Sequence, residues 1–123
     1  MKVLYFCDPL GDSEVELSII NLTLMPLGLP EAILVEDYPE PTDYDILVFD
    51  WGGMSAGNNL MISFCRHILK DAQDYPNKLY VMRSDFTAFA MKEVIEEFAL
   101  KHTKIHNIFL NLDLVEDYLK TYY

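Results

Sequence analysis

The stretch that most constrains the fold is YDILVFDWGG, residues 44–53. Its apolar run, Ile46 to Phe49, is short and unbroken, which is typical of a strand buried on both faces of a parallel sheet. The run ends in Asp50, and the sequence then breaks into Trp51-Gly52-Gly53. Because ligands in such folds bind where the strands end at their carboxyl edge, Asp50 stands where function is expected.

Length and charge limit the classes of protein that fit. The 123 residues suit a single α/β domain, residues 1–123, with one hydrophobic core. Nine basic and twenty acidic residues give a net charge of −11, so the average field repels phosphate backbones and anionic lipid. We therefore expect no direct binding to nucleic acid or membrane. A basic protein partner fits this charge, and so does acidity that serves solubility alone.

Compartment and redox state are predicted from the N-terminus and the cysteines. MKVLYF runs directly into an expected strand, so no signal peptide is predicted, and the uncharged run from Leu17 to Pro30 is too short to span a bilayer. Cys7 and Cys65 lie in apolar surroundings without C-x-x-C spacing. We expect a cytoplasmic protein in which both are reduced core residues.

Apolar runs alternate with amphipathic stretches along the chain, which predicts a three-layer, mainly parallel, Rossmann-like sheet with helices on both faces. The connection between the second and third strands is the least certain part of this topology. Its acidic and proline-rich segment, Tyr38–Tyr44, is barely long enough to recross a sheet. An antiparallel second strand is therefore an open alternative. The five expected strands are Lys2–Cys7, Ala32–Val35, Ile46–Phe49, Lys78–Met82 and Ile105–Leu110.

Four helices are expected between and after these strands. Capping signals begin them, with Ser13-x-x-Glu16 at the first and Ser84 or Asp85 at the third. Each carries an apolar stripe that we expect to face the sheet. The stripes are Val15, Ile19, Leu22 and Met25; Met61, Phe64, Cys65, Ile68, Leu69 and Ala72; Met91, Val94, Ile95 and Phe98; and, after Asp113, Val115, Tyr118, Leu119 and Tyr122.

Several segments together resemble the partition ATPases of the ParA/MinD type. The first 23 residues resemble that family's strand, deviant Walker A loop and helix, with agreement at Pro9, Gly11 and Ile20-Asn21-Leu22. YDILVFDWGG resembles the family's Walker B and switch segment, which places Asp50, Gly52 and Gly53 in switch-like positions. IFLNLD resembles the late strand whose asparagine meets the nucleotide base, here Asn111.

The phosphate loop departs from that family. Its two lysine positions are Leu10 and Val15, and its metal-binding hydroxyl position is Glu16. A phosphate loop needs backbone N–H groups, a lysine and a metal to neutralise its ligand. A like-charge contact at 4 Å instead costs about 4 kcal/mol at an effective dielectric of 20. The acidic side chains of the degenerate loop are Asp8, Asp12, Glu14 and Glu16.

The resemblance thus implies a pseudo-ATPase that has lost ATP binding, hydrolysis and the nucleotide cofactor. It would work as a non-catalytic binding or regulatory module through a protein partner, either a genuine ATPase of the same family or a second copy. The strand order of such a fold would be 5-4-1-3-2.

A second resemblance, to response-regulator receiver domains, leads to a different chemistry. Asp8, Asp50 and Asp85 follow the first, third and fourth strands, and neighbouring strands could bring these carboxylates around one Mg²⁺. The chain would then be a phosphoacceptor or phosphate-handling domain that uses Asp50, with strand order 2-1-3-4-5. Asn111 stands at the receiver's lysine position, and helix capping alone also explains acids after strands.

Two other chemistries find little support. Met82 to Phe86 lacks the cysteine and glycines of a nucleophile elbow, and no histidine is placed to serve Ser84 as a base. His102 and His106 have the spacing of a zinc pair, but a predicted helix end falls between them. We expect surface histidines and no nucleophilic catalysis.

Overall fold

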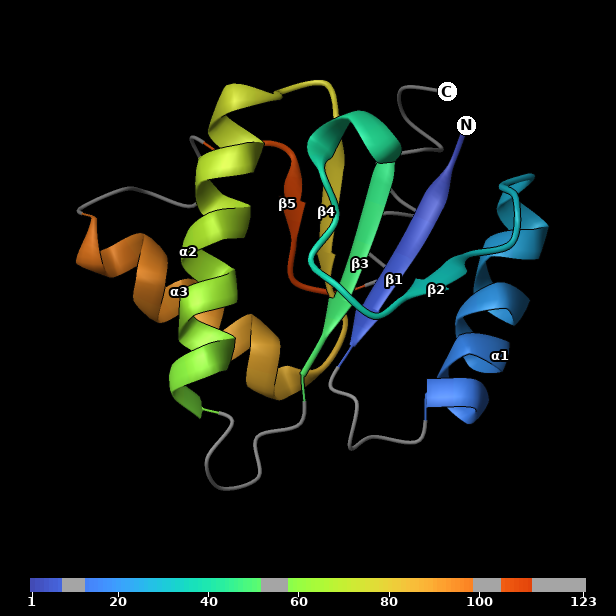
Figure 1. The fold of residues 1–123 in the computed structure, drawn as a ribbon, viewed down its shortest axis with the longest axis horizontal. Coiled ribbons are helices and arrows are strands. Elements are labelled where there is room, and N and C mark those ends of the chain that lie inside the picture. Colours follow the sequence, from blue (N-terminus) through green and yellow to red (C-terminus); the bar gives the residue numbers. More distant parts are fainter. Residues whose placement is uncertain (8–12, 52–57, 99–104, 112–123) are drawn as a thin grey trace.

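The computed structural model describes residues 1–7, 13–51, 58–98 and 105–111, which build a five-stranded sheet with helices packed against it (Figure 1). All five predicted strands are confirmed, while the helix expected after Asp113 lies outside the described residues. The strands are β1 (Val3–Cys7), β2 (Ile33–Val35), β3 (Ile46–Asp50), β4 (Leu79–Met82) and β5 (Ile108–Phe109). The α-helices are α1 (Ser13–Leu24), α2 (Asn58–Asp74) and α3 (Asp85–Glu97), and the 3₁₀ helices are η1 (Met25–Leu27) and η2 (Pro41–Asp43).

The strands are all parallel and lie in the order β2-β1-β3-β4-β5. The parallel sheet is thus confirmed, and the antiparallel alternative for the second strand is wrong. The favoured order 5-4-1-3-2 is wrong as well, whereas the alternative 2-1-3-4-5 is confirmed. Leu4 of β1 pairs with Ile33 on one side and Leu47 on the other, so β1 separates β2 from β3. Both orders require the same alternation of strands and helices, so apolar periodicity alone could not choose between them.

The connection from β2 to β3 explains how the chain recrosses the sheet without an α-helix. It passes in front of β3 in Figure 1. The Tyr38 hydroxyl donates a hydrogen bond of 2.7 Å to Asp71 Oδ2 on α2, and the Tyr38 ring stacks on Phe64 at 5.8 Å between centroids. Pro41 is buried in η2. This short loop therefore covers part of the sheet in place of a crossover helix.

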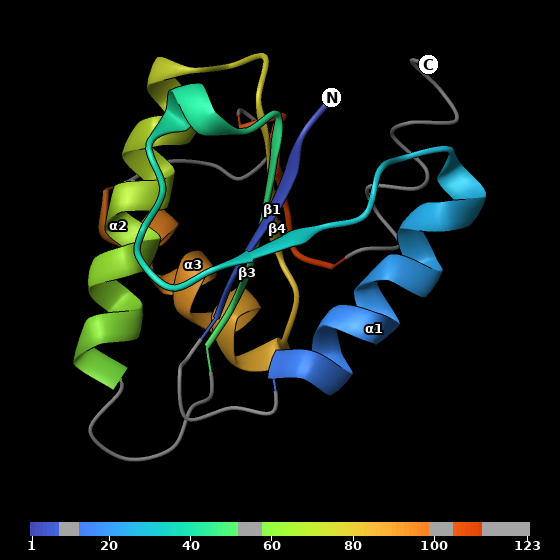
Figure 2. The same ribbon diagram turned by 45° about the vertical axis from the view of Figure 1, so that its right-hand side comes forward.

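Helices α2 and α3 lie on one side of the sheet and α1 on the other (Figure 2). Alternate strand residues face opposite sides, and each side has its own core. The α2 stripe is confirmed, since five of its predicted residues are buried and Phe64 packs against that core. On α3 the prediction holds for Met91, Val94 and Ile95 and is wrong for Phe98, which is exposed. Phe98 is the C-cap residue, beyond the last turn of the helix.

Helix α1 packs on the other side of the sheet with the face opposite to the one predicted. Ile20 and Leu24 are buried in the core, and Asn21 Oδ1 accepts a hydrogen bond of 2.8 Å from the Ala32 backbone N–H. The reason is that the apolar residues of α1 form two stripes on opposite faces, both with helical spacing. The predicted inward residues, Val15, Ile19, Leu22 and Met25, are instead 45–67% exposed.

Neither Cys7 nor Cys65 forms a disulfide bond. Cys65 is fully buried on α2, and this burial raises the pKa of its thiol to about 12. The neutral thiol therefore behaves as a small apolar core residue, as predicted. Cys7 is half-buried at the end of β1.

Candidate functional site

The site predicted from the sequence lies at the carboxyl edge of the sheet, between β1 and β3. The chain leaves β1 toward β2 on one side and continues from β3 toward β4 on the other, which makes this the topological switch point of the fold. Cys7 and Asp50 are paired across it, at the last positions of the two strands. The Asp50 side chain projects to the α1 side of the sheet, together with those of Tyr5 and Val48.

Asp50 shares one cation with a second acid. Arg83 Nη1 lies 3.5 Å from Asp50 Oδ2 and 2.5 Å from Glu16 Oε2, which reaches in from the first turn of α1. The backbone N–H of Arg83 donates to the Phe49 carbonyl at 2.9 Å, which holds the arginine beside β3. Two carboxylates against one guanidinium leave the group with a formal charge of −1. This charge favours a cation over a phosphate at the switch point.

Tyr5 adds a hydroxyl to the same group. Its O–H donates to Asp50 Oδ2 over a long distance of 3.5 Å. Burial raises the pKa of Tyr5 far above its ordinary value, and the negative charge of Asp50 raises it further. The hydroxyl therefore stays protonated and serves as a donor to the carboxylate at every physiological pH.

Two buried N–H groups at this edge find no acceptor among the residues described. They are Nε1 of Trp51, whose ring lies on the α2 side of the sheet against Phe49 and Phe64, and Nε of Arg83. Buried donors are nearly always matched in folded proteins. Because these two N–H groups lack an acceptor among the described residues, they support further polar contacts at the carboxyl edge.

The structure places the other predicted site residues apart or leaves them outside its described part. Asp85 lies in the first turn of α3 and lines a groove, while Ser84 is the N-cap, accepting from Thr87 N at 3.2 Å, as predicted. Glu14 and Asn111 are exposed, the latter two residues after β5. In the described ranges no three His, Cys, Asp or Glu side chains are grouped to hold a metal. Asp8, Pro9, Leu10, Gly11, Asp12, Gly52, Gly53 and His102 lie outside those ranges.

Because Asp8 lies outside the described residues, the Mg²⁺ site of Asp8, Asp50 and Asp85 stays a prediction. The same holds for the degenerate phosphate loop, of which Glu16 is the member that the structure brings to Asp50.

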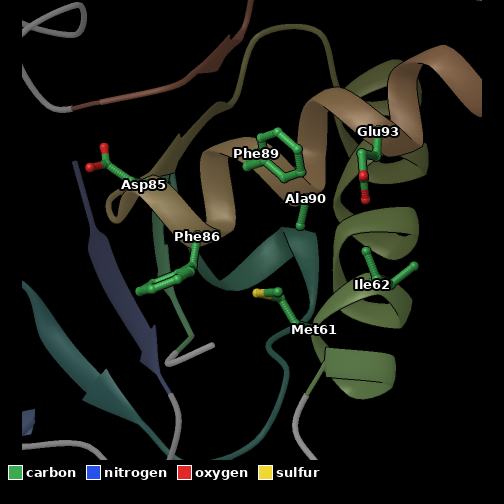
Figure 3. Close-up of a pocket in the computed structure, with 7 residues that line it drawn as sticks. All are labelled: Met61, Ile62, Asp85, Phe86, Phe89, Ala90 and Glu93. Atoms are coloured by element: carbon green, nitrogen blue, oxygen red, sulfur yellow. The ribbon is translucent and has the colours of Figure 1, made fainter. Parts of the chain in front are cut away.

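A second feature, which the sequence reasoning missed, is an apolar groove of about 510 Å³ between α2 and α3 (Figure 3). Met61 and Ala90 form its buried floor. Phe86 and Phe89 stand beside it with 62% and 65% of their surface exposed. The signal in the sequence was two aromatic residues at i and i+3 just outside the buried stripe of α3.

The rim of this groove is acidic. Asp85 and Glu93 line it at opposite ends of its α3 wall, and none of the described residues that line it is basic. A contiguous exposed apolar surface with a charged rim is typical of an interaction site.

Together, fold and site define an α/β protein of the Rossmann-like parallel type whose switch point carries an acid-arginine group. In comparisons with known proteins, no family model matches the chain, and none of the curated proteins gives a match. None of the described helices has both the length and the apolar character to cross a bilayer.

Proposed function

We propose that the chain is a non-catalytic protein-binding module whose binding surface is the groove between α2 and α3. The observation that carries this proposal is the exposure of Phe86 and Phe89 beside a floor of buried apolar side chains. Each exposed phenyl ring costs free energy in water, and burial of its exposed part against a partner would recover about 1–2 kcal/mol per ring. Aromatic side chains in such a position are typical anchors of protein interfaces.

The groove also suggests the chemistry of its partner. Apolar walls along one helix favour an amphipathic helix that inserts side chains at i, i+3 and i+4. The carboxylates of Asp85 and Glu93, on a chain with a net charge of −11, favour lysine or arginine flanking those apolar side chains. We therefore propose a basic amphipathic helix of another protein as the occupant.

A labelled helical peptide of leucine and lysine tests this proposal, with a leucine and glutamate peptide as its counterpart. Fluorescence anisotropy should show the basic peptide binding at least about tenfold more tightly, because its charges complement the rim. Phe89→Ser should weaken that binding by about tenfold, since an aromatic anchor is lost.

The control separates the groove from the charge of the whole chain. Glu93→Lys and Glu96→Lys change the net charge equally, but Glu93 lines the groove, whereas Glu96 is exposed and not among the lining residues. Only Glu93→Lys should weaken binding of the basic peptide strongly. Equal losses in both variants would contradict a groove site and indicate nonspecific attraction.

The non-catalytic part of the proposal is supported by the Asp50 group. Arg83 already engages both Asp50 and Glu16, which gives the carboxylates a structural partner. A strand order of 5-4-1-3-2 would have supported descent from the partition ATPases, but the observed order is 2-1-3-4-5. The proposal therefore rests on the partner's chemistry and not on that ancestry.

A second candidate is the Mg²⁺-dependent phosphoacceptor that uses Asp50, which the order 2-1-3-4-5 and the switch-point position of Asp50 favour. The net negative charge beside Asp50 would admit a cation if Arg83 moved aside. In the reaction, Asp50 would attack the phosphorus of a small donor such as acetyl phosphate, forming an acyl phosphate and releasing acetate.

Calorimetric titration with Mg²⁺ and labelling with acetyl phosphate test this candidate. It predicts saturable Mg²⁺ binding and labelling in the wild type, and the loss of both in Asp50→Asn. Asp74→Asn, which removes an exposed acid at the end of α2, should change neither. Labelling that persists in Asp50→Asn would exclude this role for Asp50.

A further inference from the structure

We propose that the outer face of α1 binds a second copy of the chain, with the two helices antiparallel across a two-fold axis. This face is defined by Val15, Ile19, Leu22 and Met25, which lie at helical spacing and are exposed. Helix α1 lies on the opposite side of the sheet from α2 and α3, whose residues line the groove (Figure 2). The proposal is therefore independent of the proposed function.

The polar groups of this face are already satisfied. No charged residue occurs between Leu17 and Pro30. The Ser18 hydroxyl donates to the Glu14 carbonyl at 3.1 Å and the Thr23 hydroxyl to the Ile19 carbonyl at 3.2 Å, so both bond within the helix itself. Burying the face would therefore leave no hydroxyl proton without a partner, which removes the main penalty of desolvation.

The charge of the chain points to a second copy as the occupant. A two-fold interface places the same patch on both sides, so any charge near its centre meets a like charge. In a chain with a net charge of −11, an uncharged face is the kind that tolerates self-association. The groove of α2 and α3 does not meet this condition, because Asp85 and Glu93 would face their own copies.

The same reasoning gives the orientation. Glu14 and Glu16 occupy the first turn of α1, so parallel helices would bring the acids of both copies together. An antiparallel pair places them at opposite ends of a helix about 18 Å long, beyond the Debye length of about 8 Å in physiological salt. A four-residue stripe is small for an interface, so we expect a dissociation constant in the micromolar range.

Sedimentation equilibrium between about 1 and about 200 µM tests the proposal, because a micromolar dimer dissociates within that range. The wild type should approach twice the monomer mass at the upper end. Leu22→Glu should raise the dissociation constant at least about 100-fold, since it loses apolar contact and sets two carboxylates near the two-fold axis. Phe89→Glu is the matched control, because Phe89 is 65% exposed and Leu22 67%. It should dimerise like the wild type, because α3 and α1 lie on opposite sides of the sheet.

A mixture of Leu22→Glu and Leu22→Lys gives a readout that misfolding would not produce. The two variants should form a mixed dimer, since opposite charges then meet near the axis. A wild type that stays monomeric at all concentrations would overturn the proposal, as would dimerisation of Leu22→Glu at wild-type strength or dissociation caused by Phe89→Glu. Binding of the monomer to phosphatidylcholine vesicles that Leu22→Glu abolishes would also overturn it and assign the face to lipid.

Discussion

Asn107→Asp should destabilise the fold by about 4 kcal/mol at pH 7, although it exchanges one atom of a side chain. Asn107 is 98% buried, just before β5. Its Nδ2 donates to the carbonyls of Ala72 at 2.9 Å, Lys78 at 3.0 Å and Tyr75 at 3.3 Å. One amide thus ties the end of α2, the following turn and the start of β4 to β5. A carboxylate there would face three carbonyl oxygens with no proton to share.

The loss should depend on pH, and its direction follows from the pKa of the introduced carboxyl group. Burial against carbonyl oxygens disfavours the charged form, so the folded pKa of this carboxyl group would rise above the ordinary aspartate value of about 3.9. The part of the penalty that comes from this pKa shift is absent below the unfolded pKa, grows as pH rises toward the folded pKa, and is constant above it. If the folded pKa reaches about 7, urea unfolding at pH 5.5 should show a penalty about 2 kcal/mol smaller than at pH 7.

Asn77→Asp is the control for this experiment. Asn77 lies exposed in the same turn, so it makes the identical change of charge without burial. Its free energy of unfolding should stay within about 0.5 kcal/mol of the wild type at both pH values. If the two variants behaved alike, the hydrogen bonds of the Asn107 amide would not be holding this part of the fold.

Asn111 stands out in the sequence through its place in IFLNLD, whereas nothing in the sequence marks Asn107. Strand positions were predictable because a buried parallel strand needs an unbroken apolar run, and YDILVFDWGG has one. The role of Asn107 could not be predicted, because it depends on backbone carbonyls about thirty residues away in sequence. The neighbouring sequence does not distinguish a buried asparagine that hydrogen-bonds to a turn from an exposed asparagine.

The prediction of which face of α1 is buried was wrong for another reason. Leu17, Ile20 and Leu24 are as apolar as Val15, Ile19 and Leu22, so periodicity offered two faces of the helix. Tertiary contacts of the first set with β1 and β3 decided between them. At the candidate site, Asp50 was found because it follows a strand, whereas its pairing with Arg83 required the neighbourhood of β3 and β4.

Phe49→Ala should cost about 3–5 kcal/mol of unfolding free energy, whereas Phe89→Ala should cost less than about 0.5 kcal/mol. Phe49 is fully buried at the end of β3 and packs on the rings of Phe6, Trp51 and Phe64, with centroids 5.9, 6.2 and 6.0 Å away. Its removal leaves a cavity in the aromatic cluster that joins β1, β3 and α2. Phe89 leaves no cavity, because most of its ring already faces water.

The contrast between these two variants, measured by urea unfolding, also tests why Phe89 is there. A typical domain is stable by about 5–15 kcal/mol, so a loss of about 3–5 kcal/mol is a large part of the total and core phenylalanines are held in place by folding. A stability that hardly changes in Phe89→Ala would support the proposal that Phe89, which stands exposed beside an apolar groove, serves to bind a partner. If Phe89→Ala destabilised the chain as much as Phe49→Ala, Phe89 would belong to the core, and the groove would lose its anchor.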